Sequence, residues 1–187
     1  MKTNISKTLK IIIIALMATL SLSSFKNVEF KPTTQNVGQA TTLPIWLQKK
    51  IDREIKDSTS MVSVIRYANA LTKELCYFSF TGKTIRSNQV VEGKETHTHC
   101  VGYSNVMTDI CNYAFKTKNM QAIAYHVRGE IVIDGFEVCA HLGKKNSFFK
   151  DHDYVHIISK TRFECWADPS FEDLMDVDLM IIMNEND

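Results

Sequence analysis

Apolar residues recur along this chain in two kinds of pattern, helical spacing first and short runs later. Spacings of three and four residues, which place side chains on one face of a helix, begin near Pro44 and again after Ser60. The apolar positions are Ile45, Leu47, Ile51 and Ile55 in the first stretch, and Val62, Ile65, Ala68, Leu71 and Leu75 in the second. We therefore expect two N-terminal amphipathic helices, with Pro44 in the first turn of the earlier one.

A third helical stripe begins near Cys100 and is apolar over most of its length. Its members are Tyr103, Val106, Met107, Ile110, Ala114 and Phe115. We expect this helix to be the central one of the domain. Between the second and third stripes, residues 76–80 are short and aromatic, which predicts a strand or the end of the second helix. Residues 83–99 are polar and irregular, which predicts a loop that borders a site.

After Asn119 the pattern changes to short apolar runs rich in β-branched and aromatic residues. The runs cover residues 122–127, 130–133, 154–158, 163–167 and 179–183. We predict strands there, with breaks at Arg128-Gly129 and Asp134-Gly135, a hairpin between 154–158 and 163–167, and an edge strand at 179–183. Helices followed by strands indicate an α+β domain with an antiparallel sheet.

The N-terminus has the three parts of a secretory signal. Lysines at Lys2, Lys7 and Lys10 precede an apolar run over residues 11–22, and Ser21 and Ser23 suit a cleavage site. The run is too short to span a bilayer comfortably. The sequence thus predicts a signal peptide over residues 1–24, a secreted or extracytoplasmic protein, and no stable membrane insertion after cleavage.

The rest of the chain is expected to form one domain. Residues 25–42 are polar and lack periodicity, which predicts a flexible leader, and residues 43–187 have the length and apolar content of a single domain. Cleavage removes three of 22 basic residues and none of 21 acidic ones, so 19 against 21 leaves a net charge of −2. This charge argues against a nucleic-acid partner.

Five cysteines make an odd count in a chain predicted to leave the reducing cytosol. They are Cys76, Cys100, Cys111, Cys139 and Cys165. One reactive thiol with two disulfides satisfies this count, and so do several buried free thiols. The sequence leaves both interpretations open.

Cys100 carries the strongest chemical signal. A thiol at a helix N-terminus lies at the positive end of the helix dipole, which favours the thiolate. His152 and Asp168 lie downstream. A hairpin turn centred between residues 160 and 161 would place His152 opposite the region of Asp168 and Pro169, whereas His156 would lie opposite Cys165. We therefore predict a Cys100, His152, Asp168 triad.

Each member of this triad has a defined role in acyl transfer. Cys100 would attack a carbonyl carbon, His152 would take and return the proton, and Asp168 would hold the imidazole in the useful tautomer. The backbone N–H of Cys100 would stabilise the oxyanion. The side chains of Asn88 and Gln89, in the preceding loop, are candidates for the second oxyanion donor.

Three motifs around these residues resemble the transglutaminase-like superfamily. Gly102-Tyr103-Ser104 comes shortly after Cys100, His152-x-Tyr154-Val155 leads into a predicted strand, and Trp166-Ala167-Asp168-Pro169-Ser170-Phe171 ends one. That superfamily has a Cys-x-Gly-Tyr-Ala/Ser helix start, a His-Ala-Trp-type strand and a Val-Asp-Pro-Thr-type strand end, in this order. The resemblance covers residues 100–171, and implies a papain-like core in which the cysteine helix packs against the sheet.

The same resemblance implies an activity. Members crosslink proteins, cleave or deamidate amides, or have lost catalysis, and the active ones share a thioester half-reaction. The expected substrate is accordingly a protein or peptide. Asp153 and Tyr154 stand where Ala and Trp are usual, and the interval from histidine to aspartate is about one residue longer than typical. These departures keep His156 as an alternative base.

Two other interpretations compete with the enzyme. His97, His99 and Cys100 with His126 or His141 offer zinc ligands, but adjacent ligands such as His99-Cys100 seldom fit one tetrahedron. We therefore expect no metal and no cofactor, and take His126, in an apolar strand, as a core histidine. The second alternative is a catalytically silent secreted binding module with a transglutaminase-like fold.

Overall fold

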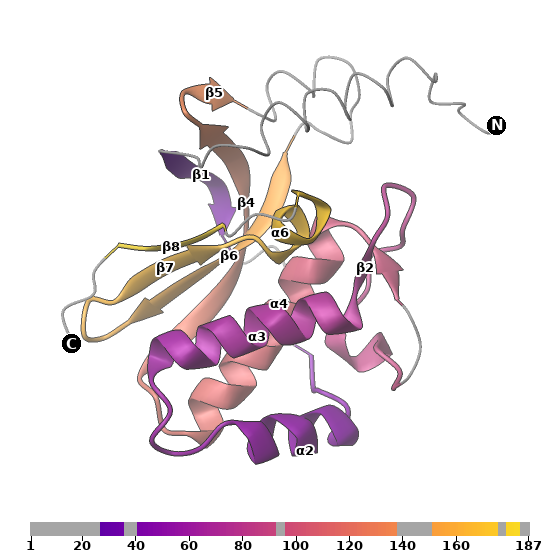
Figure 1. The fold of residues 1–187 in the computed structure, drawn as a ribbon, viewed down its shortest axis with the longest axis vertical. Helices are drawn as coiled ribbons and strands as arrows, with labels where there is room; N and C mark the ends of the chain where they lie inside the picture. The colour runs from indigo at the N-terminus through magenta and orange to yellow at the C-terminus, as the bar shows by residue number, and fades with distance from the viewer. Residues whose placement is uncertain (1–26, 36–40, 93–95, 138–150, 176–178, 184–187) are drawn as a thin grey trace.

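A layer of helices packs against an antiparallel sheet in the computed structural model (Figure 1). The structure describes residues 27–35, 41–92, 96–137, 151–175 and 179–183. Within these residues the order is helices first and most strands later, which confirms the predicted α+β class. The predicted signal peptide, residues 1–24, lies outside the described residues, as do Cys139 and His141.

The three predicted helices are present at the expected places. They are α2 (Ile45–Glu54), α3 (Met61–Leu75) and α4 (Cys100–Thr117). Ser60 caps α3, because its Oγ accepts a hydrogen bond from the Ser63 N–H. α4 contacts α2, α3, β4 and β6, so the prediction of a central helix is confirmed. No helix in the described ranges is both long and apolar enough to cross a membrane.

The sheet has the strand order β1-β4-β6-β7-β8, and β5 pairs with β4. Its strands are β1 (Val28–Gln35), β4 (Ala122–Ile133), β5 (Phe136–Glu137), β6 (His152–Ser159), β7 (Glu164–Ala167) and β8 (Met180–Ile182). β8 pairs with β7, as predicted for an edge strand. A separate parallel pair joins β2 (Tyr77–Phe78), directly after α3, to β3 (His97–Thr98), and the turn η1 (Ser87–Gln89) lies between them.

The prediction of a leader without regular structure is wrong for residues 28–35. They form β1, which runs antiparallel to β4 and carries Val28 and Phe30 into an apolar cluster beneath the sheet. Only these two apolar residues alternate with Glu29 and Lys31 before Pro32 interrupts the pattern at an irregularity in the pairing. So short an alternation of apolar and polar residues is a weak signal for a strand. Its pairing partner, β4, lies about 100 residues away along the chain, so the pairing cannot be predicted from local sequence.

The predicted break at Arg128-Gly129 is also wrong, since β4 is one continuous strand. A side chain at Gly129 would collide with the Lys31 backbone and the Tyr154 hydroxyl on the two neighbouring strands. The glycine therefore allows close approach within the sheet, which is the second common reason for glycine in a strand. The break at Asp134-Gly135 is confirmed, because both residues have positive φ in a two-residue turn to β5.

The β6–β7 hairpin is shifted by one residue from the predicted register. His156 pairs with Trp166, and the predicted partner Cys165 pairs with Ile157. The cause is a longer loop, in which the Ser159 N–H donates to the Phe163 carbonyl and Arg162 has a positive φ of 67°. The shift leaves His152 near Asp168, so the ranking of the two histidines is unchanged.

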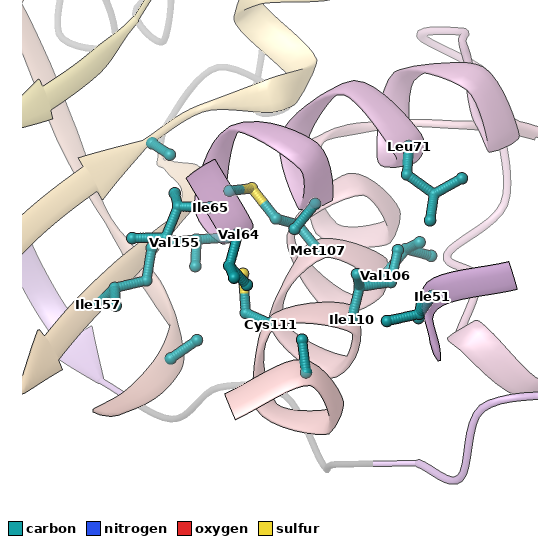
Figure 2. Close-up of a cluster of buried hydrophobic side chains, with 14 of the residues drawn as sticks. Ile51, Val64, Ile65, Leu71, Val106, Met107, Ile110, Cys111, Val155 and Ile157 are labelled. Atoms are coloured by element: carbon teal, nitrogen blue, oxygen red, sulfur yellow. The ribbon is translucent and has the colours of Figure 1, made fainter. Parts of the chain in front are cut away.

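Two apolar clusters lie on opposite faces of the sheet. Figure 2 shows the larger one, in which Met107, Ile110 and Cys111 of α4 meet side chains of α3 and β6. The smaller one contains Tyr154 and Trp166, with Phe30 of β1 stacked on Trp166. α4 is thus held rigidly against the sheet, with its first residue at the boundary between the layers.

A short helix that the sequence did not indicate follows β7 directly. It is α6 (Pro169–Met175), and Asp168 caps it, because the Phe171 N–H donates to Asp168 Oδ1 at 3.0 Å. Pro169 occupies the first helical position, where its missing N–H is not needed. The turn from β7 into α6 therefore fixes the Asp168 side chain.

Candidate functional site

Cys100 is the first residue of α4 and is 7% exposed. His99 precedes it in an extended conformation, and its carbonyl accepts hydrogen bonds from the N–H groups of Gly102 and Tyr103. The N–H groups at the start of a helix have no partner within that helix. A side chain at Gly102 would collide with Thr98 and Ile85, so this glycine lets the preceding strand pack on the first turn. The sulfur is thus placed by a rigid backbone.

His152, the first residue of β6, joins Cys100 to Asp168. Its Nε2 lies 2.6 Å from Asp168 Oδ2, and its ring is close enough to the Cys100 thiol to lower the pKa of that thiol through its charge and hydrogen bonding. Because Asp168 occupies Nε2, the nitrogen left for the thiol is Nδ1. The structure therefore brings together all three residues of the predicted triad.

Asp168 is fully buried and makes several hydrogen bonds. Oδ2 faces His152, while Oδ1 accepts hydrogen bonds from the Ser170 hydroxyl at 2.8 Å and from the Phe171 N–H. A carboxylate fixed at both oxygens can accept the Nε2–H of an imidazole in only one orientation. Phe171 also packs edge-on against the His152 ring, at 6.3 Å between ring centroids. Position and tautomer of His152 are thereby set.

The electrostatics of the site favour a thiolate and an imidazolium. Burial raises the pKa of Cys100, but the charge of His152 and hydrogen bonds from His152 and His99 outweigh it and lower the pKa from 9.0 to about 7. For His152, burial lowers the pKa, and the Asp168 carboxylate and Cys100 raise it well above 6.5. Such an ion pair is the usual resting state of an activated cysteine.

We expect the alkylation rate of Cys100 by iodoacetamide to reach half of its plateau near pH 7. Only the thiolate reacts, and a lowered pKa means that the thiolate forms at lower pH, so the rate should rise through neutrality instead of through pH 9. Mass spectrometry of the Cys100 peptide across a pH series measures this midpoint. A midpoint near 9, that of an unperturbed thiol, would contradict the assigned ion pair.

A second polar group faces Cys100 from the helix side of the sheet. Asp153 is 2% exposed, and its Oδ2 lies 3.9 Å from the Cys100 sulfur. Its Oδ1 lies 2.7 Å from His126 Nε2 and 3.4 Å from an Arg128 terminal nitrogen. Asn105 of α4 completes this network, with its Oδ1 2.9 Å from His126 Nδ1.

Asp153 is held as a carboxylate. Burial raises its pKa, but the hydrogen bond and charge of His126, followed by the charges of Arg128 and His152, lower it below 3.8. His126 is buried and both of its nitrogens have oxygen partners, as expected of a core histidine. No sequence motif indicated that Asp153 and its partners form one network, because they come from α4, β4 and β6.

His156, the alternative base, lies away from the thiol. Four residues separate it from His152, which is about 13 Å along a strand. Its Nε2 lies 2.9 Å from Glu164 Oε1, and its ring stacks on Trp166 at 3.7 Å between ring centroids. Burial lowers its pKa, with Glu164 acting in the opposite direction. The geometry favours His152 as the base.

The candidates for the second oxyanion donor are not placed near the sulfur. Asn88 and Gln89 are exposed in η1, and Gln89 Oε1 accepts a hydrogen bond from the Arg86 N–H. The turn η1 packs beside the middle of α4, where Ser87 hydrogen-bonds with Asp109. Asp109 lies nine residues beyond Cys100, which is about 13.5 Å along the helix. Their place in the loop before Cys100 does not determine which turn of α4 the two amides lie beside.

Disulfide and metal chemistry have no counterpart in the described residues. Cys76, Cys100, Cys111 and Cys165 are all buried free thiols, which favours the second of the two cysteine interpretations. Within the described ranges, no three His, Cys, Asp or Glu side chains are grouped to hold a metal ion. His97 is exposed on β3 and packs edge-on against Tyr77.

Comparison with known proteins adds no further constraint. No family model, curated protein or solved structure matches the chain. The case for a function therefore rests on the residues and their geometry.

Proposed function

We propose that this protein is a secreted cysteine-dependent enzyme of transglutaminase-like type, which acts on amide bonds of proteins or peptides through a thioester on Cys100. One observation carries the proposal: Cys100, His152 and Asp168 lie together, with His152 lowering the pKa of the thiol and contacting the buried Asp168 carboxylate. Chance arrangements of Cys, His and Asp seldom combine a helix-start thiol of lowered pKa with a buried and fully bonded carboxylate.

The arrangement can perform the first half of an acyl transfer. The Cys100 thiolate attacks the amide carbonyl carbon, and the Cys100 N–H donates to the oxyanion of the tetrahedral intermediate. The imidazolium of His152 then gives its Nδ1 proton to the leaving amine or ammonia, so that the C–N bond breaks and a thioester remains. Asp168 keeps the imidazole oriented during this proton transfer. An acceptor, water or a second amine, then resolves the thioester.

The architecture supports a papain-like core. In the resembled superfamily the cysteine helix packs against an antiparallel sheet that carries the histidine and the aspartate. Here α4 packs on β4 and β6, His152 begins β6, and Asp168 directly follows β7. Gly102 and Pro169, both within the resembling motifs, have structural reasons to be there, the first in packing and the second in starting α6.

The test incubates the purified protein with a glutamine-rich protein and a labelled primary amine. We expect release of ammonia, with or without amine incorporation, and loss of both in Cys100→Ala. Cys111→Ala is the matched control, since it removes a buried thiol from the same helix without contact with His152. Cleavage of the protein without ammonia release would identify a protease. If wild type gives none of these products, the enzyme proposal fails and the binding module is favoured.

A further inference from the structure

The Asp153 carboxylate is an unexpected neighbour for a nucleophilic sulfur. Its Oδ1 is held by His126 and Arg128, and its Oδ2 is directed at the Cys100 sulfur, 3.9 Å away. The side chain is 97% buried in this position, so the carboxylate cannot turn out to solvent without breaking the network. A negative charge is therefore fixed beside the reacting atom.

This charge works against the first half-reaction. Asp153 raises the pKa of Cys100, whereas His152, its neighbour on β6, lowers it. A site built only to form a thiolate would gain from a neutral residue at position 153. Asp153 opposes thiolate formation, yet His126 and Arg128 both hold its carboxylate in place, and such a feature indicates a second use.

We propose that Asp153 is a specificity-determining residue that selects a primary amine, such as a lysine side chain, as the acceptor for the Cys100 thioester. This inference rests on the proposed function and extends it to the second substrate. Once the thioester has formed, the sulfur is no longer an anion, and Asp153 Oδ2 remains as a fixed negative group 3.9 Å from it. An alkylammonium ion that donates a hydrogen bond to Oδ2 would be held beside the thioester, and attack requires its nitrogen to come within about 3–3.5 Å of the acyl carbon.

The chemistry favours an amine over water at this position. The ammonium first loses one proton to solvent, and the neutral nitrogen then attacks the acyl carbon. Positive charge develops on nitrogen as the C–N bond forms, and the fixed carboxylate stabilises it. The C–S bond breaks with its electron pair on sulfur, and the second amine proton passes to His152 Nδ1, which restores the thiolate and imidazolium. Attacking water gives its proton to His152 during attack, so it gains less from Asp153.

The test measures how the thioester divides between two acceptors. A glutamine peptide is supplied with Nα-acetyllysine amide, and the products counted are the isopeptide and the free acid that water forms. We expect the ratio of isopeptide to acid to fall about tenfold to 100-fold in Asp153→Asn, the range for loss of a charge-assisted hydrogen bond. Methanol, a neutral acceptor, should keep its ratio to water. Because both products come from one thioester, the ratio does not depend on the fraction of folded enzyme.

Asp151→Asn is the matched control. Asp151 is a half-exposed carboxylate two residues away that also pairs with Arg128, and its loss should leave the ratio unchanged. An unchanged amine ratio in Asp153→Asn would overturn the inference, as would an equal fall with methanol or a variant that forms no thioester. If wild type forms the thioester but never transfers it to the lysine derivative, the inference fails and the proposed function stands. Absence of any thioester in wild type refutes the proposed function itself.

Discussion

Replacement of His152 with alanine is expected to lower the rate of thioester formation by about 10⁴-fold, the upper end of the range for loss of a general base. The loss is large because His152 has two roles. Its charge lowers the pKa of Cys100, and without it burial and Asp153 both act to raise that pKa. Its Nδ1 also carries the proton to the leaving group. Single-turnover acylation, measured by mass spectrometry of the Cys100 adduct, checks this result.

His156→Ala is the control for that experiment. His156 is also a histidine of β6 with a carboxylate partner, Glu164, but its ring stacks on Trp166 far from the sulfur. We expect the acylation rate of this variant to stay within about threefold of wild type. A larger loss is expected only for a residue that acts as general acid or base at the thiol. If His156→Ala abolishes acylation and His152→Ala spares it, the assigned base is wrong.

Asp168→Asn is expected to lower acylation by about 10³–10⁴-fold, as loss of the correct imidazole tautomer does in a comparable triad. An amide nitrogen turned toward His152 would donate to Nε2, so the proton would move to Nδ1 and that nitrogen could no longer accept one from Cys100. The amide oxygen can still cap α6 through the Phe171 N–H, so the fold should persist. Acylation kinetics and urea denaturation, measured together, separate the two effects.

Ser170→Ala provides the comparison for this variant. It removes the hydrogen bond of Ser170 Oγ to Asp168 Oδ1 and its longer, 3.5 Å contact with His152 Nε2, but leaves the contact of Asp168 Oδ2 with His152. We expect a fall in acylation of about tenfold or less, because one hydrogen bond contributes about 1 kcal/mol. Equal losses in Ser170→Ala and Asp168→Asn would show that Asp168 acts through packing and not through the tautomer.

Local sequence patterns are enough to predict the three long helices. Each long helix has its own apolar stripe, so all three are placed correctly. β1 was missed because it carries only Val28 and Phe30 and gains its order from β4. Gly129 was misinterpreted because glycine marks turns and close approaches alike, and only the neighbouring strands distinguish them.

The site, too, has residues that local patterns predict and residues that they do not. Cys100, His152 and Asp168 each lie within a recognisable local motif, and the hairpin brings two of them together even with the register shifted by one residue. In the sequence, Asp153 stands out only as a departure from the motif of the superfamily that the chain resembles. Its environment depends on His126 and Arg128, which contact it from β4, and on Asn105 of α4, which contacts His126. No spacing along the chain predicts that these residues meet.

The buried cysteines have a consequence for chemical labelling. Cys100 and Cys111 lie on one helix, but burial, with the charge of Cys165, raises the pKa of Cys111, whereas that of Cys100 is lowered. Of these two thiols, only Cys100 is therefore a target for a thiol reagent at neutral pH in the native state. Attack at Cys111 requires α4 to separate from the sheet, which also dismantles the ion pair at Cys100. Labelling of Cys100 therefore reports the intact site, and labelling of Cys111 reports its disruption. The two signals can be measured separately, on the peptide that contains each cysteine.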